Sequence, residues 1–231
     1  MNHTYRRKAL SARLTTFVAG TAFLAAMGAA MFLVAGTPNL PSVWLYLALR
    51  VLFTTACVVT MSEDVARERL KPGPGVRPEP IYNAGAAIAW IAHILIVPLD
   101  LGRFHWSAGF PLWLHAAGVI LMLASMSLVV WALRHNEYLS ARIRIQGERG
   151  QRVATTGPYV YIRHPNYAGG VLLGLSSGLV FGSWPSIVPL LLWIGLLAYR
   201  TLNEERVLFA ELAGYGEYAG RVRYRFVPGV W

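Results

Sequence analysis

The sequence predicts an all-α integral membrane protein with about six transmembrane helices, the last two of which form a C-terminal helical hairpin. Composition is the first observation: hydrophobic residues make up 55% of the 231 residues and charged residues only 14%. The second is a series of apolar runs close to the roughly 20 residues that a bilayer-spanning helix needs. The third is that Lys and Arg gather in four polar segments between these runs.

The first four apolar runs each have the length of one transmembrane helix. They cover about residues 15–35, 43–61, 81–99 and 112–133. The last apolar run, residues 168–199, is too long for one span, and Gly182-Ser183-Trp184-Pro185 interrupts it. Because proline is well accommodated in the first turn of a helix, this interruption predicts two helices joined by a tight turn.

The basic residues predict the orientation in the membrane. The net charge is +10, and of the 21 Lys and Arg residues only Arg50 and Arg103 lie outside the four polar segments. With six crossings all four segments lie on one side, which the positive-inside rule makes cytoplasmic. Both termini are then expected in the cytoplasm, at the inner or plasma membrane if the protein is bacterial. Topology accounts for the charge, so no nucleic-acid partner is expected.

The N-terminal residues Arg6, Arg7 and Lys8, followed by an apolar run, also resemble a signal peptide. The run is longer than the apolar part of a typical signal peptide, so a retained first helix is the favoured interpretation.

The chain divides into two functional parts. Residues 1–133 are expected to form a four-helix transmembrane scaffold, and residues 134–231, which hold most of the polar chemistry, a catalytic region with the hairpin and a cytoplasmic C-terminal cofactor-binding segment. The Pro- and Gly-rich residues 71–80 cannot be helical. They are interpreted as a linker rather than as a cover over a site.

The motifs of most soluble enzymes are absent from the sequence. It has no P-loop, no Gly-x-Gly-x-x-Gly after a strand, no serine nucleophile elbow and no histidine pair at metal-ligand spacing. A Rossmann cofactor domain is therefore excluded, and no metal site is expected. Any nucleotide-like cofactor must be held by the membrane helices and their connections.

Residues 156–167, just before the hairpin, form the most informative segment. They contain three tyrosines together with Arg163, His164 and Pro165, and they directly precede an apolar run. Pro165 disfavours helical geometry at His164, so a fixed turn would present the imidazole. The fork of Arg163 suits a carboxylate or a phosphate. The alternative is a basic interfacial flank followed by a proline helix start.

Two further groups follow the hairpin. Arg200, Glu204 and Glu205 come just after an apolar helix and belong either to a site or to a solvated helical extension. Neighbouring helical residues point about 100° apart, so both glutamates are not expected to serve one site. Tyr215 and Tyr218 could line a ligand pocket or form an interfacial aromatic belt, and the belt is the favoured interpretation.

Taken in order, these groups resemble the isoprenylcysteine carboxyl methyltransferase family, within the wider group of membrane phospholipid methyltransferases. The resemblance covers about residues 134–231. It depends on Gly157-Pro158-Tyr159, then Arg163-His164-Pro165-x-Tyr167-x-Gly169, then Glu204-Glu205 with Leu208, Tyr215, Tyr218 and Pro228-Gly229.

The resemblance implies a membrane methyltransferase that uses S-adenosylmethionine and accepts a lipophilic or lipidated acceptor from the bilayer. It assigns catalysis to Arg200, Glu204 and Glu205, with Arg200 close to an acceptor carboxylate. It assigns cofactor binding to Tyr159, Arg163, His164, Pro165, Tyr167, Glu205, Tyr215 and Tyr218. The family usually has Gly, two residues and then Tyr near its end, whereas Gly214 here directly precedes Tyr215. Which glutamate corresponds to the family's is therefore open.

The favoured reaction is carboxyl O-methylation of an isoprenylcysteine-like lipid. A carboxylate is already ionised at neutral pH and needs no base, whereas an amine acceptor would need one, with Glu205 or His164 as candidates. The alternatives are phospholipid N-methylation, a non-catalytic protein of the same fold that binds a lipid or a partner, and a reductase with a nicotinamide cofactor. The oligomeric state is left open.

Overall fold

A computed structural model describes the backbone of residues 3–231 and the side chains from Ala12 onward, so the predicted N-terminal basic cluster of Arg6, Arg7 and Lys8 lies outside the described side chains. The described residues form eight α-helices and no strands, which agrees with the predicted all-α class. The helices are α1 (His3–Ala35), α2 (Pro41–Thr60), α3 (Glu63–Leu70), α4 (Pro80–Leu99), α5 (Leu112–His135), α6 (Pro165–Phe181), α7 (Ile187–Glu211) and α8 (Tyr215–Arg221).

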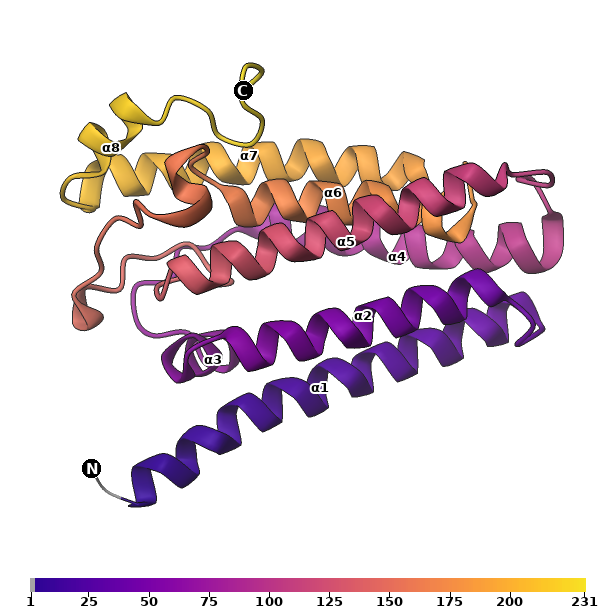
Figure 1. Ribbon diagram of the computed structural model, residues 1–231, viewed down its shortest axis with the longest axis horizontal. Coiled ribbons are helices and arrows are strands. Elements are labelled where there is room, and N and C mark those ends of the chain that lie inside the picture. Colours follow the sequence, from indigo (N-terminus) through magenta and orange to yellow (C-terminus); the bar gives the residue numbers. More distant parts are fainter. Residues whose placement is uncertain (1–2) are drawn as a thin grey trace.

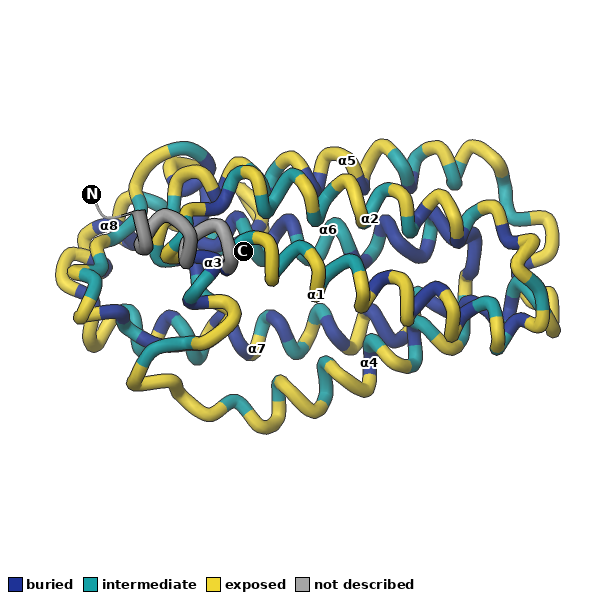
Figure 2. Tube along the Cα trace, turned by 90° about the horizontal axis from the view of Figure 1, so that it is seen from below, coloured by how far each residue is buried: buried dark blue, intermediate teal, exposed yellow. Residues whose placement is uncertain are grey.

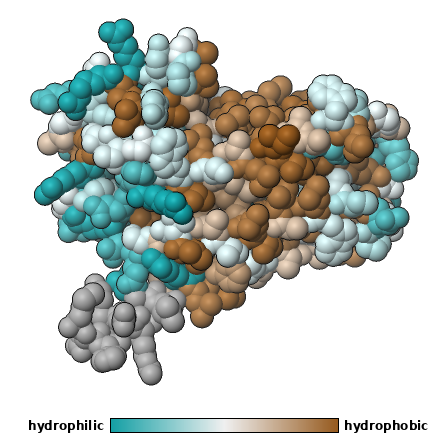
Figure 3. All heavy atoms as spheres, in the orientation of Figure 1, coloured by the Kyte–Doolittle hydropathy of each residue, from teal (hydrophilic) through white to brown (hydrophobic). Residues whose placement is uncertain are grey.

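The six long helices run along one axis and form an elongated bundle (Figure 1). The turns at residues 36–40, 100–111 and 182–186 lie together at one end, called here the far end. The longer connections at residues 61–79 and 136–164, together with α8 and the C-terminal segment, lie at the opposite end, called here the basic end. Hydrophilic residues gather at the basic end, whereas hydrophobic residues cover the middle of the bundle (Figure 3). An apolar girdle of this kind is typical of a bilayer-spanning protein.

Four helices are long and apolar enough to cross a membrane, and they match the four predicted runs. The candidate spans are Ala12–Ala35, Pro41–Thr60, Pro80–Phe104 and Leu112–His135. Pro41 and Pro80 each stand in the first turn of their helix, where the missing N–H would have no intrahelical partner. Much of the surface along these spans is exposed (Figure 2), as lipid contact requires.

The predicted C-terminal hairpin is present as α6 and α7, which run alongside the candidate spans (Figure 1). Helix α6 ends at Gly182, whose φ of 76° is left-handed and whose N–H donates to the Gly178 carbonyl at 3.0 Å. Helix α6 has 17 residues, and α7 carries charged residues from Arg200 onward. Length and composition alone therefore identify four spans, not six.

Two short helices at the basic end were not foreseen. Helix α3 begins after Ser62, whose hydroxyl accepts the Val65 N–H at 3.3 Å, and Glu63 and Asp64 occupy its first turn. This is a favourable helix start, because both the cap and the acidic residues suit the positive end of the helix dipole. Helix α8 follows Gly214, which takes a φ of 80°.

Small residues bring α5 and α6 close together. A Cβ on Gly169 would lie 2.5 Å from Val129, and the Ser125 hydroxyl donates to the Gly169 carbonyl at 2.6 Å. A Cβ on Gly118 would meet the Val180 nitrogen at 2.7 Å. Close contacts at small residues are a general device of membrane helix packing. The contact between α5 and α6 fixes the position of the start of α6, where the candidate site lies.

The far end is tied together by a buried carboxylate. Asp100 is fully buried and accepts the Ser107 N–H at 2.8 Å, the Ser107 hydroxyl at 2.5 Å and the Ser183 hydroxyl at 2.6 Å. These bonds join the turn after α4 to the turn between α6 and α7. His93, about two turns before Asp100 in α4, contacts the Ser177 hydroxyl at 3.0 Å and the Ser186 carbonyl at 2.8 Å.

Candidate active site

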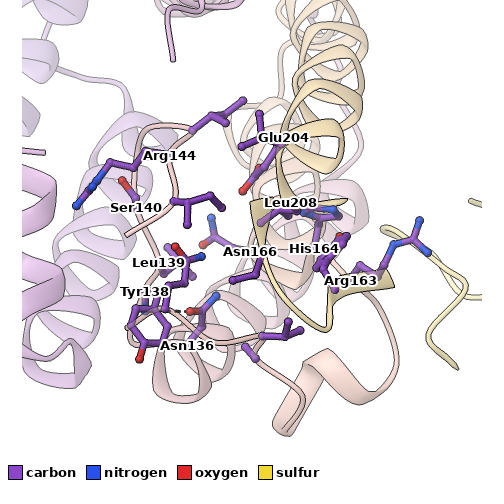
Figure 4. A pocket seen from close by; sticks show the side chains of 18 of the residues that line it. Asn136, Tyr138, Leu139, Ser140, Arg144, Arg163, His164, Asn166, Glu204 and Leu208 are labelled. Carbon is purple, nitrogen blue, oxygen red and sulfur yellow. Dashed lines mark hydrogen bonds between the residues drawn. The ribbon is translucent and has the colours of Figure 1, made fainter. Parts of the chain in front are cut away.

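The site cavity lies at the basic end of the bundle. Its walls come from residues 136–154, the 3₁₀ turn Gly157–Val160, the start of α6, the last turns of α7 and α8. In Figure 4, Glu204 and Leu208 of α7 face the cavity from one side, and Ser140 lies opposite. Seven of the predicted site residues line it: Tyr159, Arg163, His164, Tyr167, Glu204, Tyr215 and Tyr218.

The turn at Arg163 and His164 has the predicted non-helical geometry. His164 has φ −126° and ψ 60°, and α6 begins at Pro165. The N–H groups of Arg163 and His164 donate to the carbonyls of Tyr224 and Arg225 at 2.9 and 3.0 Å. The C-terminal segment therefore holds the turn from behind, and it is the proline that frees these N–H groups from the helix.

Glu205 is the centre of a buried ion cluster beside this turn. Its Oε1 accepts from Arg163 Nε at 2.6 Å and contacts His164 Nε2 at 3.2 Å, and its Oε2 accepts from Arg225 Nε at 2.7 Å. The Tyr215 hydroxyl donates to Oε1 at 3.3 Å. An ionised carboxylate can only accept, so His164 Nε2 carries the hydrogen and Nδ1 is the nitrogen left for other contacts.

The cluster keeps Glu205 ionised. Burial alone would raise the pKa of Glu205, but the hydrogen bonds from His164, Arg163 and Arg225 outweigh burial and lower the pKa to about 2. Glu205 does not line the site cavity; it lies behind the wall that Arg163 and His164 form. In Figure 4 the Arg163 side chain points away from the cavity toward the C-terminal segment, where its Nη1 donates to the carbonyls of Val222 and Arg223, both at 3.0 Å.

Glu204, unlike Glu205, borders the site cavity. The Tyr167 hydroxyl donates to Glu204 Oε2 at 2.5 Å. Among the described side chains no arginine or lysine pairs with Glu204 within 4 Å, whereas Arg163 and Arg225 both pair with Glu205. The helix thus directs the two glutamates into different surroundings, as the 100° spacing predicts. Only Glu204 offers a carboxylate to a ligand in the cavity.

Five tyrosines line the cavity: Tyr138, Tyr159, Tyr167, Tyr215 and Tyr218. Tyr218 is buried and donates its hydroxyl to the Tyr159 carbonyl at 2.8 Å. The Tyr159 hydroxyl accepts from Asn136 Nδ2 at 3.1 Å, and burial raises the pKa of Tyr159, which keeps this hydroxyl protonated at neutral pH. Tyr215 is 4% exposed. The aromatic-belt interpretation of Tyr215 and Tyr218 is therefore wrong, because both rings pack inward.

Arg200 is not part of the cavity wall. Its Nε donates to Glu79 Oε1 at 2.7 Å, and its Nη2 lies 3.3 Å from Glu79 Oε2 and 2.8 Å from the Ala141 carbonyl. The guanidinium lies 4.8 Å from the ring centre of Tyr82 and 5.4 Å from that of Tyr167. A carboxylate of the chain itself therefore already neutralises Arg200. Pro165 also lies outside the cavity wall, as do Arg200 and Glu205. It is the first residue of α6.

Sequence reasoning missed the connections that complete the site. Glu79 belongs to the segment interpreted as a linker, yet it holds Arg200, and the Pro74 carbonyl of the same segment accepts from Arg144 at 2.8 Å. Arg144 is buried and pairs with Glu68 of α3 at 2.8 Å, so it anchors the cavity wall at residues 138–145 to α3. No local signal in the sequence indicates these pairs, because each joins residues that are far apart along the chain.

Comparison with known proteins bears on the same part of the chain. Residues 113–212 match the family model described as Phospholipid methyltransferase. The match begins in α5 and ends just after α7, so it contains Tyr159, His164, Tyr167 and both glutamates. No curated protein matches the chain significantly.

Proposed function

We propose that the site cavity transfers a methyl group from S-adenosylmethionine to a lipid acceptor at the membrane surface, in a chain whose residues 113–212 match the family model described as Phospholipid methyltransferase. The observation that carries the proposal is the convergence of His164, Tyr159, Tyr167 and Glu204 on one cavity at the end of the apolar bundle. Enzymes of this family use S-adenosylmethionine.

The residues of the site cavity fit this cofactor. S-adenosylmethionine combines a sulfonium cation, a flat adenine ring and an amino-acid carboxylate. The tyrosine rings offer faces for the adenine and the cation, Glu204 offers a carboxylate for the cation, and Arg142 and Arg152 border the cavity as partners for the carboxylate. When bound, the cofactor supplies an electrophilic methyl group.

The chain's main contribution is positioning. A methyl transfer needs its reacting groups aligned, and holding them in place removes several kcal/mol from the barrier, on the order of 7–11 in the best cases. The Glu205 cluster supplies this rigidity by fixing His164 through Nε2 and Arg163 through Nε. Arg163 and Glu205 are therefore positioning residues, whereas His164 and Glu204 face the ligand.

The electrostatics favour an amine acceptor over a carboxylate acceptor. The carboxylate acceptor that the family resemblance favours would require a free cation, and the candidate, Arg200, is paired with Glu79. The side chains of this pair are each 7% exposed, so an acceptor carboxylate would have to displace a buried partner. Arg142 and Arg152 are assigned to the carboxylate of the cofactor. Glu204, which has no cationic partner among the described side chains, instead suits an ammonium group. We therefore propose N-methylation of a lipid amine.

Glu204 is the base in this proposal. An ammonium group must lose a proton before its nitrogen can attack a methyl carbon, and a carboxylate in the cavity can take that proton. Glu205, one of the two bases considered from the sequence, is held by two arginines and contacts His164, and its pKa is lowered to about 2, so it is a poor proton acceptor. The Tyr167 hydroxyl orients the Glu204 carboxylate.

Six crossings, with both termini in the cytoplasm, are part of the proposal. The hairpin of α6 and α7 runs the length of the bundle beside the four candidate spans (Figure 1). With α6 and α7 as the fifth and sixth spans, the basic end faces the cytoplasm by the positive-inside rule. The cofactor, a water-soluble cytoplasmic molecule, would then reach the site cavity directly.

Calorimetric titration of the purified protein in detergent with S-adenosylmethionine tests the cofactor assignment. Saturable binding is expected, and His164→Ala should weaken it about tenfold, as loss of one desolvated contact does. Glu204→Ala should reduce the rate of methyl transfer by at least about 100-fold, the value of a general base. Glu217→Ala, an exposed glutamate on α8, is the matched control and should change neither. Absence of binding by the unaltered protein would end the methyltransferase proposal.

An acceptor comparison tests the amine assignment. The unaltered protein should methylate phosphatidylethanolamine and leave a prenylcysteine carboxylate unmodified. Glu79→Gln removes the counter-ion of Arg200 but keeps the side-chain volume, so the ratio of carboxylate to amine methylation should rise by about tenfold or more. A protein that already methylates the prenylcysteine and ignores the amine would contradict the assignment and favour carboxyl O-methylation.

A further inference from the structure

A second cavity lies beside the site cavity, and none of the roles assigned above uses it. It lies between residues 77–82, at the start of α4, and residues 199–211 of α7. Apolar and aromatic side chains form much of its lining, including Ile81, Tyr82, Tyr199 and Val207. Asn203 adds an amide.

The second cavity lies at the level where the bundle enters the membrane. Pro80 begins a candidate span, so the first turn of α4 marks the bilayer boundary on this side. Ile81 is 62% exposed and Tyr199 44% exposed, although both line the cavity. The exposed start of α4 is visible in Figure 2. The cavity is therefore open sideways, toward the lipid headgroup region, where tyrosines are enriched.

A close helix contact bounds the cavity on the membrane side. A Cβ on Gly85 would lie 2.6 Å from Leu196, so α4 and α7 touch there. Between this contact and the basic end the two helices leave room for the second cavity. A lipid at this position could lay its acyl chains along the outside of α4 and α7 while its polar part entered between them.

A thin partition separates the two cavities. Ile143 and Val207 line both of them. The carbonyl of Ile143 accepts the Arg77 N–H at 2.9 Å, which ties the partition to the segment before α4. Glu204, the only carboxylate among the site-cavity residues, stands one helical turn from Val207 on the site side. A group that passes the partition therefore arrives at Glu204.

The charges around the second cavity cancel. Glu79 is paired with Arg200, and Glu211 is paired with Arg77 across the outer rim at 2.5 Å. No unpaired basic side chain lines this cavity, so an anionic headgroup would find no counter-ion there. A headgroup without net charge, in which phosphate and ammonium balance, suits the lining better.

We propose that the second cavity is the binding site of a zwitterionic aminophospholipid. The lipid enters sideways from the bilayer between α4 and α7, its glycerol and phosphate lie beside Tyr82 and Asn203, and its ammonium group passes between Ile143 and Val207 to Glu204. The inference rests on the proposed N-methylation for the identity of the headgroup, but the site itself is defined by the second cavity.

Filling the cavity tests the proposal through kinetics. Asn203→Trp should place an indole in the second cavity, and it should raise the KM for phosphatidylethanolamine about tenfold or more while changing the dissociation constant of S-adenosylmethionine less than about twofold. Leu202→Trp, which adds the same side chain to the neighbouring, outward face of α7, is the matched control. Ile81→Trp narrows the same cavity from α4. It provides a second, independent test in case Asn203→Trp fails to fold. An unchanged KM in both Asn203→Trp and Ile81→Trp would overturn the proposal.

Photo-crosslinking tests lipid binding without any turnover. Phosphatidylethanolamine with a diazirine close to its headgroup should crosslink to residues 77–82 and 199–211 in vesicles, and unlabelled phosphatidylethanolamine should compete better than phosphatidylglycerol. If these crosslinks form but S-adenosylmethionine does not bind, the lipid site stands and the methyltransferase proposal fails. If phosphatidylethanolamine is methylated but the crosslinks map to other helices, the lipid site fails and the proposed function stands.

Discussion

Each end of the bundle contains a buried carboxylate that links the α6–α7 hairpin to other parts of the chain, and these two carboxylates, Asp100 and Glu205, differ in their partners. At the far end Asp100 accepts from a backbone N–H and two serine hydroxyls, all neutral. At the basic end Glu205 accepts from two arginines and contacts a histidine and a tyrosine.

The difference in partners indicates that the two buried carboxylates have different roles, one in closing a turn and one in positioning the residues of the site cavity. Neutral donors satisfy Asp100 and close a turn. Three of the residues that contact Glu205 also line the site cavity, namely Arg163, His164 and Tyr215. Replacing a buried ion cluster by apolar residues often costs no stability, so stability is a weak reason to keep one. Orientation of groups around a ligand is the stronger reason. The comparison predicts that damage at the basic end impairs activity and that damage at the far end impairs only folding.

The largest effect is expected for Glu205→Ala. It leaves Arg163, His164 and Arg225 without their common acceptor, and breaking a buried charge cluster by removing one partner costs about 3–5 kcal/mol. Methyl transfer should fall at least about 100-fold, with a lower thermal midpoint in detergent. Glu205→Gln, which keeps the shape, should recover part of the stability but little of the activity. Full activity in Glu205→Ala would show that the cluster does not position the wall.

Acid should act more gradually on the same cluster. The pKa of Glu205 is lowered from 4.5 to about 2, so the cluster's contribution to stability is complete above about pH 4.5 and is lost as the pH falls toward 2. The free energy of unfolding should fall by on the order of 3 kcal/mol over this pH range. Thermal midpoints measured between pH 7 and pH 2 should show this fall, and Glu205→Gln should lack the part that belongs to Glu205. Equal acid sensitivity in that variant would contradict the assignment.

The smallest effect on activity is expected for Asp100→Ala at the far end. Three donors lose a buried acceptor, which costs about 1–3 kcal/mol for each group left unsatisfied, so the thermal midpoint should fall clearly. The affinity for S-adenosylmethionine and the rate per folded molecule should stay within about twofold. A large loss of activity in the folded variant would break the comparison, because it would couple the far end to the site.

Much of the fold could be predicted because it depends on local sequence. The four spans follow from the length of apolar runs, and the hairpin follows from Gly182 and Pro185, whose backbone preferences act within a few residues. The turn at His164 was predictable for the same reason, since Pro165 restricts its neighbour directly. Short helices were not foreseen, because α3 and α8 are too short to leave a clear hydrophobic period.

The parts of the site that escaped prediction depend on contacts between distant residues. Nothing near Glu79 in the sequence indicates that it pairs with Arg200. Adjacent Glu204 and Glu205 look alike in the sequence, and the turn of α7 gives only Glu205 the cationic partners. Tyr215 and Tyr218 have the composition of an interfacial belt, and only the packing of α8 turns them inward.

The bonds from Arg163 to the C-terminal segment also set an order of events during synthesis. The carbonyls of residues 222–225 that hold this turn are synthesised after all six long helices. A nascent chain can therefore insert all its apolar helices while its Arg163–His164 turn is still loose. Membrane insertion and assembly of the reactive centre become separate stages, and the chain gains its ligand-ready shape only in the second.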